Sequence, residues 1–152
     1  MNLFLTGSTG YIARALIPEL LLRGHTVRAL IRPGSERKLV NGARPVIGNA
    51  LDASTFARYV APSDTFIHLV GVAHPSPAKA EEFRTIDLVS IQQSVLAAKG
   101  SSIAHFIYLS VAHPAPAMKA YVAVRQEGER LLRESAIPST FVRPWYVLGP
   151  GH

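Results

Sequence analysis

A run of small and polar residues near the start of the chain has the composition of a phosphate-binding turn. The segment 6–13 reads TGSTGYIA and lies between an apolar stretch at 2–5 and apolar residues at helical spacing. Gly7 permits a tight turn, Gly10 lets the backbone approach a pyrophosphate, and Ala13 is small enough for close helix packing. The first N–H groups of that helix would face the negative charge. We therefore predict phosphate contacts from Gly7, Ser8, Thr9, Gly10, Tyr11 and Ile12. The alternative is an ordinary strand–turn–helix whose glycines are only steric.

Basic residues follow about 20 residues later, where dinucleotide-binding folds place the side chain that selects the ribose. Residues 30–32 hold no acid that could grip a ribose 2′-hydroxyl, and Arg32 ends the second apolar stretch. A guanidinium there suits a 2′-phosphate, because it forms paired charge-assisted hydrogen bonds. The cluster Arg32, Arg37 and Lys38 thus predicts NADP rather than NAD, the alternative being a solvated basic turn.

Strand-like and helix-like segments alternate along the whole chain and would hold these residues in place. Continuous apolar runs predict buried parallel strands, and 3.6-residue spacing predicts helices. The strands are expected at 2–5, 26–31, 45–48, 64–70, 104–110 and 139–143, and the helices at 10–23, 35–40, 52–60, 81–99 and 118–135. Ser35 and either Asp52 or Ser54 are the expected helix caps, and Ile86, Val89, Val95 and Leu96 the expected buried face of the long helix. This alternation predicts an α/β fold, a doubly wound parallel sheet of Rossmann type with strand order 3-2-1-4-5-6.

Composition restricts the class of protein further. The 152 residues form one domain with a sizeable core and contain no cysteine, so no disulfide or cysteine-based metal site is possible. No apolar run approaches the roughly 18 residues that span a bilayer, and a cytoplasmic, membrane-free protein is expected. Seven of the 16 basic residues but only two of the 10 acids lie in residues 1–50, giving +5 of the net +6. The positive charge therefore accompanies the phosphate-binding turn, and no nucleic-acid partner is expected.

Several motifs together resemble the extended and atypical short-chain dehydrogenase/reductase superfamily over essentially the whole chain. The turn, with Thr6, is similar to the pattern Thr-Gly-x-x-Gly-x-x-Gly/Ala, and Gly48–Asp52 looks like Gly-Asp-Leu-x-Asp. Ile67–Gly71 resembles Ile-His-Leu-Ala-Gly, Phe106–Ser110 resembles the strand that ends in a serine, and Arg143–Gly151 resembles Arg-Pro-x-x-Val-Tyr-Gly-Pro-Gly. The resemblance implies further cofactor contacts from Asn49, Ala50, Val70, Gly71, Val72 and Pro144. Thr85 stands where the family commonly has asparagine.

The same resemblance implies a catalytic group. The family uses a tyrosine as acid/base with a lysine one helical turn later, and this chain has Tyr121 followed by Arg125. Ser110 would hydrogen-bond the substrate oxygen beside Tyr121. Arginine keeps the positive charge but replaces a compact ammonium with a planar fork. The resemblance therefore implies an NAD(P)-dependent reductase or epimerase-like enzyme acting on an unidentified small molecule. The alternative is a non-catalytic dinucleotide-binding regulator similar to the nitrogen-regulator group of the superfamily, with Tyr121 a packed aromatic and Arg125 a surface cation or a partner of Glu129.

Two loops share a histidine–proline pattern, and the chain ends soon after the sixth strand. His74 and His113 either flank a substrate cleft or lie where prolines simply stop each strand. No metal site is expected from two histidines without a nearby carboxylate. Extended family members place a substrate-binding region after the sixth strand, so residues 1–152 are expected to be an NAD(P)-binding domain from which that region is largely absent.

Overall fold

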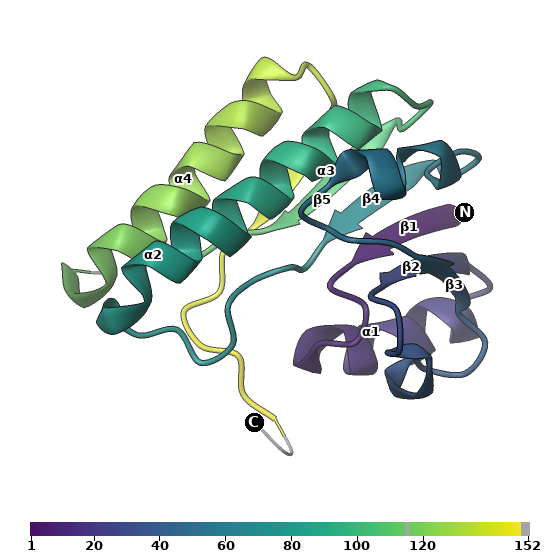
Figure 1. The fold of residues 1–152 in the computed structure, drawn as a ribbon, viewed down its shortest axis with the longest axis horizontal. Coiled ribbons are helices and arrows are strands. Elements are labelled where there is room, and N and C mark those ends of the chain that lie inside the picture. Colours follow the sequence, from purple (N-terminus) through teal and green to yellow (C-terminus); the bar gives the residue numbers. More distant parts are fainter. Residues whose placement is uncertain (115, 150–152) are drawn as a thin grey trace.

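The computed structural model describes residues 1–114 and 116–149 as a six-stranded parallel sheet with helices on both faces (Figure 1). The strands are β1 (Asn2–Thr6), β2 (Thr26–Ile31), β3 (Arg44–Ile47), β4 (Thr65–His68), β5 (His105–Leu109) and β6 (Ser139–Val142). Their order is β3-β2-β1-β4-β5-β6, so the predicted order 3-2-1-4-5-6 and the doubly wound α/β class are confirmed. Every adjacent pair is parallel.

Alternation along β1 divides the core between the two faces of the sheet. Leu3 and Leu5 point to the face covered by α1 (Tyr11–Leu22), where they pack with the buried residues Ala13 and Ile17. Phe4 points to the other face, covered by α3 (Val89–Lys99) and α4 (Lys119–Glu134), which lie side by side in Figure 1. This arrangement follows from the period of two in a strand, because neighbouring side chains point to opposite faces.

A row of aromatic rings links three strands on the α3 and α4 face. Phe4, Phe66 and Phe106 occupy matching positions of β1, β4 and β5. Their ring centroids are 5.2 Å apart between Phe4 and Phe66 and 4.8 Å apart between Phe66 and Phe106. Such contacts add about 0.5–1.5 kcal/mol each beyond burial, so they help to fix the register of β1, β4 and β5.

Two expected helices are shorter and differently wound than the sequence predicts. In place of a helix at 35–40 there is one 3₁₀ turn, η1 (Glu36–Lys38), and Ser35 makes no side-chain cap. In place of a helix at 52–60 there are two 3₁₀ turns, η2 (Ala53–Thr55) and η3 (Ala57–Tyr59), separated by Phe56 at φ −136°. Asp52 does cap η2, accepting the Ser54 N–H. In each case the segment closes only single turns, too short to propagate an α-helix.

The long helix after β4 is the other departure. It consists of α2 (Ala80–Glu82), a six-residue π-helical segment η5 (Phe83–Leu88) and α3. Val95 is buried as predicted, but Leu96, also predicted to be buried, is 61% exposed, because the buried face of α3 follows Ile91, Val95 and Ala98 at regular α-helical spacing. A π-helical segment often accompanies a functional site, and η5 lies beside the cavity described below. Short 3₁₀ turns η4 (Pro77–Lys79) and η6 (Pro116–Met118) precede α2 and α4.

Candidate functional site

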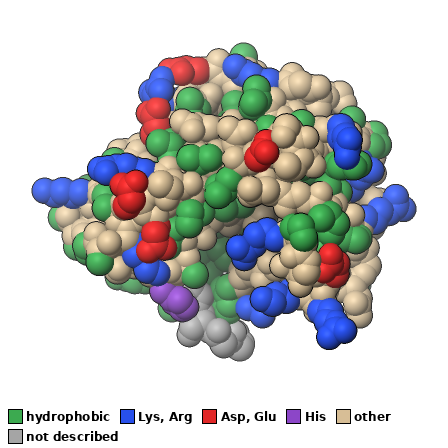
Figure 2. All heavy atoms as spheres, in the orientation of Figure 1, with side chains coloured by type: hydrophobic (Ala, Val, Ile, Leu, Met, Phe, Trp, Pro, Cys, Tyr) green, Lys and Arg blue, Asp and Glu red, His purple; other side chains and the backbone are tan. Residues whose placement is uncertain are grey.

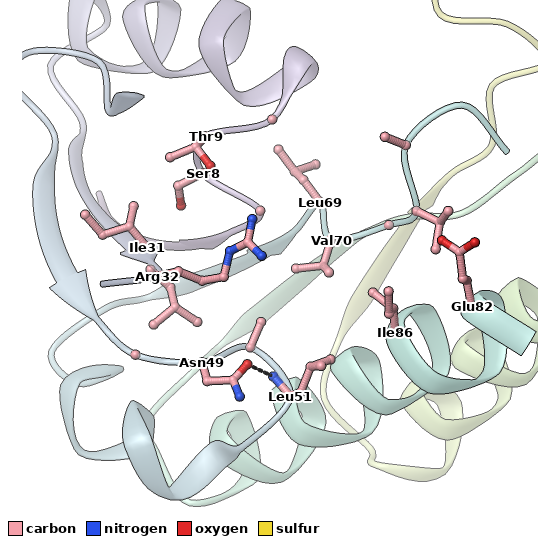
Figure 3. A pocket seen from close by; sticks show the side chains of 18 of the residues that line it. Ser8, Thr9, Ile31, Arg32, Asn49, Leu51, Leu69, Val70, Glu82 and Ile86 are labelled. Carbon is pink, nitrogen blue, oxygen red and sulfur yellow. Dashed lines mark hydrogen bonds between the residues drawn. The ribbon is translucent and has the colours of Figure 1, made fainter. Parts of the chain in front are cut away.

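A cavity of about 910 Å³ opens at the carboxyl ends of β1, β2, β3 and β4 (Figure 3). This is the edge where parallel α/β sheets bind ligands, at the point where the chain switches from one side of β1 to the other. In Figure 2 the surface is hollowed near the centre of this view, and Lys and Arg side chains gather on the side formed by α1, β2 and β3. The cavity is lined by Gly7, Ser8, Thr9, Gly10, Leu30, Ile31, Arg32, Pro33, Gly48, Asn49, Ala50, Leu51, Leu69, Val70, Gly71, Val72, Ala73, Lys79, Glu82 and Ile86.

The glycine turn forms one wall, and its two glycines have different structural reasons. Gly7 has φ +75°, and a Cβ there would lie 2.7 Å from the Leu69 carbonyl carbon, so the fold itself requires glycine. Gly10 has ordinary extended geometry at the N-cap of α1, and a Cβ there would meet only the Gly7 oxygen, at 3.1 Å. Ser8 turns its hydroxyl inward and donates to the Leu5 carbonyl at 2.7 Å. The first N–H groups of α1 have no intrahelical partner, so this wall offers donors and a positive dipole to an anion.

Arg32 extends from the end of β2 across the cavity in Figure 3. The other basic residues of the predicted cluster, Arg37 and Lys38, lie on η1 and do not line the cavity. Arg32, Lys79 and Glu82 are the charged residues among those that line it. The wall around Arg32 contains no carboxylate at the position of a ribose-gripping acid.

Asn49 lines the floor of the cavity after β3. Its Oδ1 accepts the Leu51 N–H at 3.0 Å, and its own N–H donates to the Thr55 hydroxyl at 2.9 Å. These two bonds fix the loop, and the side-chain NH₂ group remains available to an acceptor on a ligand. Ala50, also predicted, lines the cavity beside it.

The opposite wall comes from the loop after β4 and from the helix that follows. Val70, Gly71 and Val72 line the cavity, as does Ala73, whose carbonyl accepts a hydrogen bond from Lys79 Nζ at 2.7 Å. The sequence reasoning missed Lys79, Glu82 and Ile86, which line the cavity from η4, α2 and η5. Glu82 and Ile86 are four residues apart in the predicted helix 81–99, which places them on one helical face and was a usable signal, whereas Lys79 precedes that helix.

Beneath this wall lies a buried group of polar side chains. Arg125 Nη2 is 2.6 Å from Asp87 Oδ1, and both side chains are almost fully buried. His68 Nδ1 lies 3.0 Å from the hydroxyls of both Thr6 and Ser94. Burial, with the charge of Arg125 as the second cause, lowers the pKa of His68 from 6.5 to about 3. The imidazole is therefore neutral at physiological pH.

The three residues expected to form the catalytic group lie outside the residues that line the cavity. Ser110 is buried and donates to Glu129 Oε1 at 2.7 Å. Tyr121 is half-buried, with its ring 5.0 Å from that of Phe83 and the Arg125 guanidinium 5.1 Å above it. Arg125 is neither a surface cation nor a partner of Glu129, because it binds Asp87.

Glu129 instead joins α4 to the segment after β6. It accepts hydrogen bonds from Arg143 and Arg133 as well as from Ser110. Burial acts to raise the pKa of Glu129, but these three hydrogen bonds outweigh it and lower the pKa from 4.5 to about 2. Glu127 pairs with Arg130 on the surface. Both glutamates are therefore held in ion pairs with arginine side chains.

The remaining predicted contacts lie near the cavity without lining it. Tyr11 and Ile12 begin α1 and are half-buried. The Tyr11 hydroxyl lies close to Gly149, so the segment after β6 crosses the start of α1. The Pro144 carbonyl accepts the Ala112 N–H at 3.0 Å. Residues 150 and 151 of the predicted Arg143–Gly151 motif, and residue 115 of the second histidine loop, lie outside the described residues.

Neither metal ligation nor a membrane span has structural support in residues 1–114 and 116–149. His74 and His113 are exposed, and no group of three or more His, Asp or Glu side chains in this part of the chain could hold a metal ion. No helix found there has the length and apolar character to cross a bilayer.

Comparison with known proteins identifies the class. A family model described as NAD(P)H-binding matches residues 7–149, so the chain belongs to this family and is an NAD(P)-binding domain. A ketoreductase from Stigmatella aurantiaca, 4-hydroxy-2-methyl-3-oxo-4-farnesyl-3,4-dihydroquinoline-1-oxide ketoreductase, is 26% identical over 98% of this chain and 51% of its own length. The chloroplastic divinyl chlorophyllide a 8-vinyl-reductase of Oryza sativa subsp. indica is 31% identical over 94% of this chain and 39% of its own length.

Solved structures show the same fold. The UDP-glucuronic acid 4-epimerase of Bacillus cereus, in complex with NAD, superposes with a TM-score of 0.81 at 20% identity, over 100% of this chain and 58% of that one. The Bordetella bronchiseptica enzyme WbmH, in complex with NAD⁺, gives 0.80 at 22% identity, over 98% and 57%. The resemblance to reductases and epimerases of the extended short-chain type is thus confirmed. The chain spans about half or less of the length of the curated relatives named above.

Proposed function

We propose that this chain binds NADP(H) in preference to NAD(H), as the dinucleotide-binding part of a reductase or epimerase-like enzyme. The observation that supports the preference is Arg32, which reaches across the cavity where an acid would select the 2′-hydroxyl of NAD. Its guanidinium offers two parallel donors to a 2′-phosphate. The chain spans about half or less of the length of those relatives. We therefore propose, by analogy with them, that the substrate is bound by a further region and that the whole protein carries the activity.

The cavity fits a dinucleotide at its other contacts. The N–H groups at the start of α1 suit a pyrophosphate, and the space beside Gly10, which no side chain fills, allows its close approach. Asn49 and Ala50 would border the adenine. Val70, Gly71 and Val72 would contact the dinucleotide from the opposite wall. Tyr11, Ile12 and Pro144 would support this site from outside the lining, and Arg37 and Lys38 would add positive charge at longer range.

When bound, the cofactor supplies hydride transfer. Tyr121 is the proposed acid/base that exchanges a proton with the substrate oxygen, and Ser110 is the proposed group that hydrogen-bonds this oxygen. Ser110 donates its one hydroxyl hydrogen to Glu129, so in this arrangement it can accept a hydrogen bond from a substrate hydroxyl but cannot donate one to a substrate carbonyl oxygen. The alternative is a chain that binds the dinucleotide without turning it over.

A pair of fragments tests the assignment of Arg32 directly. Adenosine 2′,5′-bisphosphate and adenosine 5′-monophosphate differ only in the 2′-phosphate. We expect the bisphosphate to bind the wild type at least tenfold more tightly, and Arg32→Glu to abolish that difference, since each charge-assisted hydrogen bond contributes roughly 1.5–3 kcal/mol. Arg58→Glu, on η3 at an exposed position outside the lining, is the matched control for a general loss of charge. Equal affinities of the two fragments for the wild type would refute the assignment.

A further inference from the structure

Arg125 is a deeply buried arginine near the cavity, and its N–H groups donate to buried protein atoms rather than to solvent. The residue is 3% exposed. Its Nη2 binds Asp87 Oδ1 at 2.6 Å, and its Nη1 donates to the Leu109 carbonyl at 2.9 Å and to the Val70 carbonyl at 3.3 Å. One guanidinium thus connects α4 with the end of β5, with η5 and with the loop after β4. None of these donors faces the cavity, which Arg125 does not line.

Asp87 carries the connection to the cavity wall. Its second oxygen, Oδ2, accepts the Val72 N–H at 3.0 Å. Burial raises the pKa of Asp87, while Arg125 and the Val72 N–H act to lower it. The carboxylate therefore depends on its arginine partner to remain charged in a buried position.

Two of the three residues of the wall are hydrogen-bonded to this pair, and the third packs against it. The Val70 carbonyl accepts from Arg125, and the Val72 N–H donates to Asp87. Between them, Gly71 lies so close to the guanidinium that a Cβ would overlap Nη2 and come within 3.5 Å of Asp87 Oδ1. The Val70 carbonyl and the Val72 N–H are thus bonded to one ion pair, Gly71 packs against it, and the same three residues line the cavity.

A lysine could not replace this arrangement. A single ammonium on a flexible stem has no planar fork, so it cannot meet a carboxylate and two carbonyls in different directions with the same geometry. The sequence resemblance implies that the cation at position 125 faces the reacting groups. The contacts indicate another use of the charge.

We propose that Arg125, through Asp87, is a positioning residue that holds segment 70–72 in the shape that binds the dinucleotide. This proposal rests on the proposed function, because it assigns the wall to that ligand. Loss of either partner leaves a buried charge uncompensated and releases the Val72 N–H and the Val70 carbonyl. The wall then loses its fixed shape, and cofactor affinity falls, while selection at the 2′-phosphate by Arg32 is unaffected.

Binding and amide hydrogen exchange, measured on the whole chain, test this role together. In Asp87→Asn and Arg125→Lys we expect the NADPH dissociation constant to rise at least tenfold, with an unchanged ratio of NADPH to NADH affinity. We also expect faster hydrogen exchange of the Val72 amide. This is measured without denaturant, at a pH where the amides of β1 and β4 stay protected. Arg130→Met removes an arginine from the exposed face of the same helix and should change neither readout. Gly71→Ala, which keeps both charges, should weaken binding in the same way.

The double variant Asp87→Asn/Arg125→Gln separates positioning from stability. Removing both charges relieves the uncompensated burial, so we expect its melting temperature to recover toward wild type while the dissociation constant stays raised. Recovery of affinity together with stability would overturn the positioning role, as would Val72 exchange in Asp87→Asn that matches wild type. Failure of the wild type to bind either dinucleotide would instead overturn the proposed function, and the exchange result would still decide whether the ion pair holds the wall.

Discussion

Replacing Gly10 by valine should separate folding from cofactor binding. The backbone at Gly10 is extended, at φ −75° and ψ 170°, which any residue adopts. A Cβ there meets only the Gly7 oxygen, at 3.1 Å, so a shift of a few tenths of an ångström accommodates it. Loss of glycine at this cap position costs about 1 kcal/mol of stability. The rest of the valine side chain occupies the space beside the free N–H groups of α1, where the pyrophosphate must lie.

The expected loss of affinity follows from the hydrogen bonds that the valine blocks. A backbone N–H to a charged phosphate oxygen contributes roughly 1.5–3 kcal/mol, so losing two raises the NADPH dissociation constant about 100-fold or more. Titration calorimetry measures this change, and circular dichroism verifies that Gly10→Val is folded. Gly7→Ala is the contrasting variant. It should lose the fold, because positive φ costs about 1–2 kcal/mol and its Cβ would overlap the backbone after β4. Normal NADPH binding by Gly10→Val would refute the phosphate assignment.

Three other predictions concern the groups around the cavity. Tyr121→Phe, made in the longest natural form of the protein, should leave NADPH affinity unchanged and abolish turnover of a carbonyl substrate, and turnover that survives would exclude the acid/base role. Because the pKa of His68 is lowered from 6.5 to about 3, the unfolded chain takes up this proton first. Stability should therefore be complete above pH 6.5 and fall by about 1.4 kcal/mol per pH unit as the pH drops toward 3. Urea titrations at several pH values should show that the free energy of unfolding of His68→Asn depends less steeply on pH between 6.5 and 3. An identical pH dependence would contradict a neutral buried imidazole. Glu129→Gln should lower the free energy of unfolding by about 1–3 kcal/mol at pH 7 because Ser110, Arg133 and Arg143 lose a charged acceptor; an unchanged urea midpoint would count against this network.

The sequence predicts the sheet well because the signals for strands are local. Six apolar runs of four to seven residues mark the six strands, and right-handed crossovers leave few possible orders. Helix boundaries depend more on tertiary contacts. The 3₁₀ turns on either side of Phe56 and the π-helical segment η5 depart from the regular α-helical spacing that the sequence predicts. No periodicity rule contains that information.

The site shows a similar division. The glycine turn, Arg32 and Asn49 could be placed on one edge of the sheet because each directly follows a predicted strand. The pairing of Arg125 with Asp87 could not, since 38 residues separate them and only the packing of α4 on η5 brings them together. The same holds for Ser110 and Glu129. Sequence spacing therefore identified the residues that border the cavity more readily than those that support it.

The central claim is that the cavity binds NADP(H) and prefers it to NAD(H). Calorimetric titration of the chain with NADPH and NADH, at the same pH and ionic strength, tests it most directly. We predict a single site for NADPH with a dissociation constant at least tenfold below that for NADH. Equal affinities, or tighter binding of NADH, would contradict the role assigned to Arg32 and with it the proposed cofactor preference.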